Sequence, residues 1–152
     1  MRSPRLLIAL LFALLFAVVL GPAQAQPPAG KKHDHEMMHA LLKTKHLLMK
    51  ANHNYEGHRV NAIKHINNAV GELRKEAQAR GFKGPGPVYK GKEPQWESNK
   101  QLHRAIKELH AVHMRLEKDL DHTPRRDRAR KHIHNAVTEL EAALKVKPTK
   151  KK

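Results

Sequence analysis

The sequence predicts an all-α protein, an up-down-up-down four-helix bundle built from two repeated helical hairpins. The first observation is an internal repeat: residues 64–73 (KHINNAVGEL) recur as residues 131–140 (KHIHNAVTEL) at an offset of 67 residues, with eight of ten positions identical. The second is that apolar residues recur every three or four positions in four segments, which is the spacing of one helix face. The third is a glycine- and proline-rich segment between the second and third of these. A repeated unit of this size buries its apolar face against its copy.

Residues 1–25 have the three parts of a secretory signal peptide. A positively charged start precedes a 15-residue apolar run (residues 6–20), and Ala23 and Ala25 supply small residues two apart for cleavage. The run is shorter than the about 20 residues that a bilayer span needs. We therefore expect an exported protein, periplasmic or secreted, whose mature chain has no transmembrane segment.

The first hairpin is expected at residues 34–80. It follows a disordered leader at residues 26–33, which contains histidine and lysine but no large apolar residue. Its helices should run from about residue 34 to 52 and from about residue 58 to 80. The expected apolar stripes are Met38, Leu41, Leu42, Lys45, Leu48 and Met49 in the first helix, and Ala62, Ile63, Ile66, Ala69, Val70, Leu73 and Ala77 in the second.

Residues 81–94 form a linker, because four glycines and three prolines in this segment exclude a helix or a central strand. The second hairpin is expected at residues 95–146, and a basic tail at residues 147–152. Its second helix should start at Thr123 as N-cap and Pro124 as first helical residue. Short connections favour antiparallel neighbours, hence the up-down-up-down order. The expected stripes are Leu102, Ile106, Leu109, His113, Leu116 and Leu120, then Ala129, Ile133, Ala136, Val137, Leu140 and Leu144.

Composition excludes several classes of function. The chain has no cysteine, which rules out disulfides, thiolate metal sites, a thiol nucleophile and covalently attached c-type haem. It has no serine-nucleophile motif, no phosphate-binding glycine loop and no zinc-protease motif, so we expect it not to be an enzyme. The formal net charge of +16 favours an anionic partner surface.

Thirteen histidines are the main chemical signal. His46 and His65 lie about equally far from the first hairpin turn, and His113 and His132 are their repeat equivalents. A bundle with both turns at one end would place these four in one layer. Because imidazole suits zinc, copper and nickel, we predict a transition-metal site on His46, His65, His113 and His132, with haem b as a lower-ranked sub-case. The alternative is that they are half-exposed histidines without a shared ligand, since only His113 lies on its helix's apolar stripe.

Further histidines are predicted as secondary metal ligands. His33 and His35 belong to a short His-Asp-His-Glu tract, a composition that binds Cu(II) or Ni(II). The pairs His35 with His39 and His110 with His113 have the spacing of one helix face. These four positions (His33, His35, His39 and His110) would add to the internal layer.

Two functions follow from this reasoning. The first is an exported, non-enzymatic, histidine-rich bundle that binds a transition metal as a buffer or carrier. The alternative is a basic protein that binds a polyanion such as lipopolysaccharide, anionic lipid, extracellular DNA or acidic polysaccharide. The candidate polyanion-binding residues are clustered at the start of the last helix: Arg125, Arg126, Arg128, Arg130 and Lys131.

Overall fold

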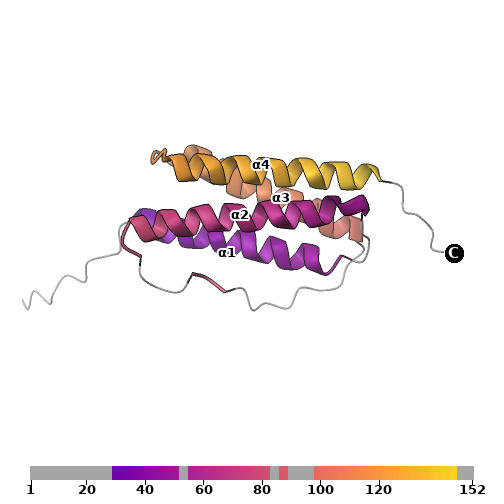
Figure 1. Ribbon diagram of the computed structural model, residues 1–152, viewed down its shortest axis with the longest axis horizontal. Helices are drawn as coiled ribbons and strands as arrows, with labels where there is room; N and C mark the ends of the chain where they lie inside the picture. Colours follow the sequence, from indigo (N-terminus) through magenta and orange to yellow (C-terminus); the bar gives the residue numbers. More distant parts are fainter. Residues whose placement is uncertain (1–28, 52–54, 83–85, 89–97, 147–152) are drawn as a thin grey trace, which may run out of the picture.

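Four α-helices make up the regular structure of the described chain. The computed structural model describes residues 29–51, 55–82, 86–88 and 98–146, and no strand occurs within these ranges. The all-α prediction is confirmed for this part of the chain, and the four helices agree with a helical bundle (Figure 1). The elements are α1 (Ala29–Met49), the 3-10 turn η1 (Tyr55–Gly57), α2 (His58–Ala79), α3 (Ser98–Lys118) and α4 (Pro124–Lys145).

The starts of α2 and α4 agree with the sequence-based expectation. The Thr123 hydroxyl accepts a hydrogen bond from the backbone N–H of Arg126 at 3.3 Å, and Pro124 is the first helical residue. The helix α2 starts at His58, directly after Gly57, whose φ of +91° is left-handed. Glycine adopts this conformation without a Cβ clash, so the turn before α2 depends on Gly57.

The start of α1 differs from the expectation. Residues 26–33 were expected to be disordered, but α1 begins at Ala29. The reason is tertiary, because Asp34 is fully buried and bonded to Arg126 of α4, which holds the first turns of α1 against the bundle. The predicted signal peptide, residues 26–28 of the leader, residues 83–85 and 89–94 of the linker, and the basic tail lie outside the described residues.

Each helix has two neighbours. The helix α1 packs against α2 and α3, and α4 packs against the same two helices, so α1 lies diagonally opposite α4. The most extensive interface is between α2 and α4. Five alanines without solvent exposure lie on these two helices, and their small side chains let the helix backbones approach closely: Ala62, Ala69, Ala129, Ala136 and Ala143.

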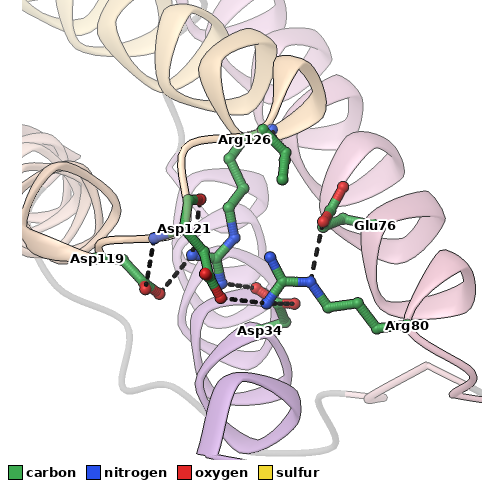
Figure 2. A network of polar contacts seen from close by, with 7 residues as sticks. Asp34, Glu76, Arg80, Asp119, Asp121 and Arg126 are labelled. Carbon is green, nitrogen blue, oxygen red and sulfur yellow. Dashed lines mark hydrogen bonds and ion pairs between the residues drawn. The ribbon is translucent and has the colours of Figure 1, made fainter.

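Charged contacts at one end of the bundle reveal the helix directions (Figure 2). Asp34, near the start of α1, lies 2.5 Å from Arg126, near the start of α4. Arg80 and Asp121, just past the ends of α2 and α3, lie 3.1 Å apart, and Arg80 is also 4.0 Å from Asp34. The helices α1 and α4 therefore start at this end, while α2 and α3 finish there. The order is up-down-down-up, and the predicted up-down-up-down order is wrong.

The length of the connection between α2 and α3 explains this difference. Seventeen residues separate Arg80 from Ser98. An extended chain gains about 3.3 Å per residue, so this segment exceeds the about 33 Å length of a 22-residue helix. The preference of short connections for antiparallel neighbours therefore does not apply here, and α3 can start at the end of the bundle where α2 also starts.

The core is aliphatic and follows the expected stripes most closely in α2 and α4. In α1 and α3 the buried face is turned only partly away from the prediction, because three of the six expected positions in each helix remain buried: Met38, Leu41 and Leu48 in α1, and Leu102, Leu109 and Leu116 in α3. Met49 is 58% exposed, Leu120 is 94% exposed, and His113 is only half-buried, because Val112 takes the core position. The buried positions in these two helices include Met37, Met38, Leu41, Thr44, Leu47 and Leu48 in α1, and Leu102, Ala105, Leu109, Val112 and Leu116 in α3.

Candidate functional site

A buried ion-pair network closes the end of the bundle where α1 and α4 begin (Figure 2). The Arg126 guanidinium, only 2% exposed, lies between the carboxylates of Asp34 and Asp119. Arg80 Nε donates to Glu76 Oε1 at 2.9 Å. Burial raises the pKa of Asp34, although Arg126 acts in the opposite direction. Acids and bases here pair with one another, although Asp34 Oδ2 and Arg126 Nε are buried without a hydrogen-bond partner. We assign the network a structural role, holding together four helices.

The predicted polyanion cluster at the start of α4 is largely neutralised. Arg126 belongs to the buried network and cannot meet a partner surface, so its assignment as a polyanion-binding residue is wrong. Arg128 lies 2.8 Å from Glu72, and Arg130 lies 3.3 Å from Asp127. The other two predicted residues are half-buried Arg125 and exposed Lys131.

Two histidines on facing helices form a pair at the edge of the α2–α4 interface. The ring centroids of His65 and His132 are 5.7 Å apart, and the ring planes are inclined by 33°. Both residues are half-buried, and the Nδ1 atom of each is buried without a hydrogen-bond partner. An unpartnered buried polar atom costs about 1–3 kcal/mol. One metal ion or one shared proton between the rings would give both residues a partner.

Carboxylates flank the His65–His132 pair. Glu139 Oε2 lies 2.7 Å from His58 Nδ1 and accepts a 3.5 Å hydrogen bond from Asn61. Glu72 Oε2 accepts a 2.9 Å hydrogen bond from Arg128 Nε. Asn61 and Arg128 are separated by the repeat offset of 67 residues, as are Glu72 and Glu139. Equivalent side chains thus make corresponding contacts on the two sides of the pair.

The environment keeps His132 neutral near pH 7. Burial is the main cause that lowers the pKa of His132, and the nearby His65 lowers it further, while Glu72 raises it. Metal ions bind the neutral form of imidazole. The hydrogen bond with His58 lowers the pKa of Glu139, so this carboxylate supplies negative charge beside the pair at neutral pH.

A second histidine contact joins α3 to α4. The ring centroids of His113 and His134 are 6.5 Å apart, with an inclination of 50°. Burial lowers the pKa of His113, and Glu117 raises it. His110 also lies near enough to act on the charge of His113.

The four predicted ligands do not meet in one layer, so the shared four-histidine site is wrong. His65 and His132 pair with each other, whereas His113 faces His134, and His46 lines a separate cavity beside α1. Within the described residues, no group of three or more histidine, aspartate or glutamate side chains is placed to hold a metal ion. Aliphatic side chains fill the core between the helices, so histidines meet only along the edges of neighbouring helices.

The secondary histidine positions are dispersed over the surface. His33, His35, His39 and His110 are all exposed. His35 lies beside Phe82, with ring centroids 6.1 Å apart. One of the two acids of the predicted chelating tract, Asp34, is fully buried and pairs with Arg126, so it is not available as a ligand beside His33 and His35. The other acid, Glu36, is exposed.

Sequence reasoning missed the Asp34–Arg126 pair and the contact made by His134. A signal for the pair exists, since Asp34 and Arg126 each stand three residues before a buried apolar residue, Met37 and Ala129. Oppositely charged residues on two apolar stripes indicate a buried ion pair. His134 lies on the exposed face of α4, and only the position of α3 reveals its neighbour.

No family model, no curated protein and no solved structure matches this chain.

Proposed function

We propose that this protein is an exported, non-enzymatic helical bundle that binds a divalent transition-metal ion, as a buffer or carrier. The observation that supports the proposal is the His65–His132 pair, in which two half-buried rings from different helices have unpartnered Nδ1 atoms. Two imidazoles whose rings lie close together, and whose Nδ1 atoms are buried without a hydrogen-bond partner, are suited to sharing one ligand.

The separation of the two rings fits a shared ion. With metal–nitrogen distances of about 2.0–2.1 Å, two imidazoles on one tetrahedral ion have centroids about 5 Å apart. The centroids of His65 and His132 are 5.7 Å apart, so the separation of the rings is close to that of two imidazoles on one ion. Water or a small anion would complete the coordination, as in metal sites that keep open positions.

Two carboxylates near the pair would offset the positive charge of a bound ion. The charge of Glu72 raises the pKa of His132, and the charge of His65 lowers the pKa of Glu139, so each carboxylate lies near one ring of the pair. Either carboxylate could become a third ligand by releasing its present partner, Arg128 or His58. With only two fixed ligands, the ion would exchange readily, which suits a buffer or carrier.

The choice of metal follows from the donors. Imidazole binds copper, nickel and zinc, and affinity for divalent ions at such sites rises to a maximum at Cu(II). We expect Cu(II) to bind most tightly, followed by Ni(II) and Zn(II). Haem b is ranked lower, because none of the histidines in the described part of the chain is fully buried, and an axial ligand inside a bundle would have to be.

We further propose that the two hairpins are copies related by a two-fold axis through the His65–His132 pair. The supporting observation is that the two residues are repeat equivalents and meet each other directly. The matching contacts of Asn61 with Glu139 and of Arg128 with Glu72 support the same arrangement. A site on such an axis receives the same residue from each hairpin.

Calorimetric titration of the purified protein with Cu(II), Ni(II) and Zn(II) at pH 7 tests the metal proposal. His65→Ala and His132→Ala should each lower the affinity for Cu(II) at least about tenfold, because one of two ligands is lost. His103→Ala is the matched control, since His103 is an exposed histidine on α3, outside this pair. Equal Cu(II) affinity in the two pair variants and the control would rule out the pair as the binding site.

Export is part of this proposal and rests on residues 1–25. Among the described residues, no helix combines the length and the hydropathy needed to cross a bilayer. We expect the protein recovered from the periplasm or medium to begin at Gln26. Intact-mass measurement checks this, and an unprocessed N-terminus in exported protein would contradict it.

Binding to an anionic polymer or anionic lipid surface is a second proposal, favoured by the net charge of +16. Lys64 and Lys131, which are repeat equivalents, are both exposed. Heparin affinity should fall steeply as salt rises, by counterion release. The double variant Lys64→Gln/Lys131→Gln should weaken binding more than the single control Lys107→Gln. Affinity that does not change with salt would exclude this proposal.

A further inference from the structure

A cleft of about 580 Å³ opens between α1 and α3, beside the buried ion-pair network. Glu36 and Met37 of α1 line the cleft, as do Arg115 and Lys118 in the last turn of α3. Residues 119–121, which follow α3, also contribute to the lining. Pockets that bind small molecules have volumes of about 300–1,000 Å³, so the cleft has room for such a ligand.

Two apolar side chains give the cleft a surface for an apolar ligand. Met37 is the most deeply buried of the lining residues, at 2% exposure, whereas Leu120 is 94% exposed. The unbranched methionine side chain adapts to ligands of different shape. An apolar group placed in the cleft would contact Met37 and would cover part of Leu120.

The two aspartates of the cleft are already paired with arginines of the network (Figure 2). Asp119 forms an ion pair with Arg126, and Asp121 lies 3.1 Å from Arg80. Burial acts to raise the pKa of Asp119, but the hydrogen bond with Arg126 outweighs it and the pKa is lowered. Both carboxylates are therefore charged at neutral pH, and each has a guanidinium that offsets its charge.

The basic side chains of the cleft have no such partners. Arg115 and Lys118 are exposed, and neither forms an ion pair with another residue in the described part of the chain. They stand at positions i and i+3, on one face of α3. His33 also lines the cleft, and Glu36 is its one acid without a basic partner among the described residues. The unpaired charge of the cleft is thus positive on balance, which attracts an anion.

We propose that this cleft binds a small organic anion with an apolar body. The carboxylate, sulfonate or phosphate group of the ligand contacts Arg115 and Lys118, since both side chain types bind such groups. The apolar body lies along Met37 and Leu120. This site is independent of the metal proposal, because no residue of the His65–His132 pair lines the cleft.

Fluorescence titration of the full protein with the aromatic sulfonate ANS tests this inference. We expect saturable binding, displacement of ANS by decanoate, and weaker binding of phenylnaphthylamine, the uncharged analogue of ANS. The double variant Arg115→Gln/Lys118→Gln should weaken ANS binding at least about fivefold, because two ion pairs with the ligand are lost. Lys107→Gln/Lys145→Gln is the matched control, since it removes the same charge from exposed positions outside the cleft.

Two further variants change the cleft in opposite directions. Glu36→Gln should tighten ANS binding, because it removes the unpaired acid, whereas Glu141→Gln, at an exposed position of α4 outside the cleft, should not. Leu120→Asn should weaken ANS binding, because the ligand loses an apolar contact.

Three results would overturn the inference. Equal weakening by the two double variants would assign ANS binding to the net charge of the protein. Phenylnaphthylamine binding as tight as that of ANS would show that the cleft does not select an anion, and failure of decanoate to displace ANS would exclude an aliphatic carboxylate. Cu(II) affinity should be the same in Arg115→Gln/Lys118→Gln as in the unaltered protein, which separates this test from that of the metal proposal. Circular dichroism verifies folding, and every side chain replaced here is exposed.

Discussion

Replacing Arg126 by methionine should destabilise the fold in a pH-dependent way. The change leaves the carboxylate of Asp34, which has no solvent exposure, with Arg80 at 4.0 Å as the one cation still paired with it among the described residues. Breaking a buried ion pair by removing one partner costs about 3–5 kcal/mol. Asp34 can avoid part of this cost by taking up a proton, since burial already raises its pKa above the ordinary 3.8.

Protonation of Asp34 limits how much stability Arg126→Met can lose, and this limit changes with pH. Keeping a carboxyl of ordinary pKa 3.8 protonated costs about 1.4 kcal/mol for each pH unit above that value, or about 4 kcal/mol at pH 7 and about 1.6 kcal/mol at pH 5. The folded variant holds its proton more tightly than the unfolded chain. Its stability therefore falls as pH rises through the interval between 3.8 and the pKa of Asp34 in the folded variant. We expect Arg126→Met to lose about 3–4 kcal/mol at pH 7 and clearly less at pH 5.

Urea unfolding followed by circular dichroism at both pH values measures this effect. Arg128→Met is the matched control, because Arg128 lies on the same helix as Arg126 but is 53% exposed. It removes only the ion pair with Glu72 of α2, and an exposed pair of this kind is worth less than about 1 kcal/mol. The double variant Asp34→Leu/Arg126→Met should recover most of the lost stability, since it removes both buried charges. A loss below about 1 kcal/mol for Arg126→Met, equal at pH 7 and pH 5, would refute this reasoning.

Three further predictions, made with four substitutions, test other parts of the structure. Gln101→Met should leave the free energy of unfolding unchanged or raise it by up to about 1–3 kcal/mol, because both polar side-chain atoms of Gln101 are buried without a partner; urea unfolding checks this. Gly71→Ala should raise the free energy of unfolding by about 0.5–1 kcal/mol, because Gly71 lies inside α2 and open space surrounds the added Cβ. Gly57→Ala should lower it by about 1 kcal/mol, because Gly57 has a φ of +91°. Equal effects of the two substitutions in urea unfolding would contradict this backbone argument. Glu139→Gln should flatten the loss of thermal stability below pH 4.5. The hydrogen bond with His58 lowers the pKa of Glu139, so the contribution of Glu139 to stability is complete above pH 4.5 and is lost as pH falls through the pKa of the folded protein. Thermal melts measured from pH 7 down to acid pH check this, and the same loss of stability below pH 4.5 in Glu139→Gln and the unaltered protein would contradict it.

The local features of this protein follow from the sequence. Thr123 and Pro124 start α4, and Gly57 precedes α2, because capping and left-handed turns depend on residues only a few positions apart. The three- and four-residue spacing of apolar residues likewise predicts four helices and most of the core of α2 and α4. The absence of a nucleophile or phosphate-loop motif, and the number of histidines, are also properties of the sequence alone.

Helix direction, helix neighbours and the pairing of the histidines depend on the tertiary structure. A connection of 17 residues between Arg80 and Ser98 permits either direction for α3, and the buried pair of Asp34 with Arg126 belongs to the observed one. Neighbouring residues on a helix point about 100° apart, so a shift of one residue in packing brings a different face to the interface. The repeat shows which residues are equivalent, but it does not show which helix faces meet. His65 meets His132 and His113 meets His134 only because α4 lies between α2 and α3 in the bundle. Sequence spacing reports which residues share a helix face, whereas contacts between faces are decided by packing over the whole chain.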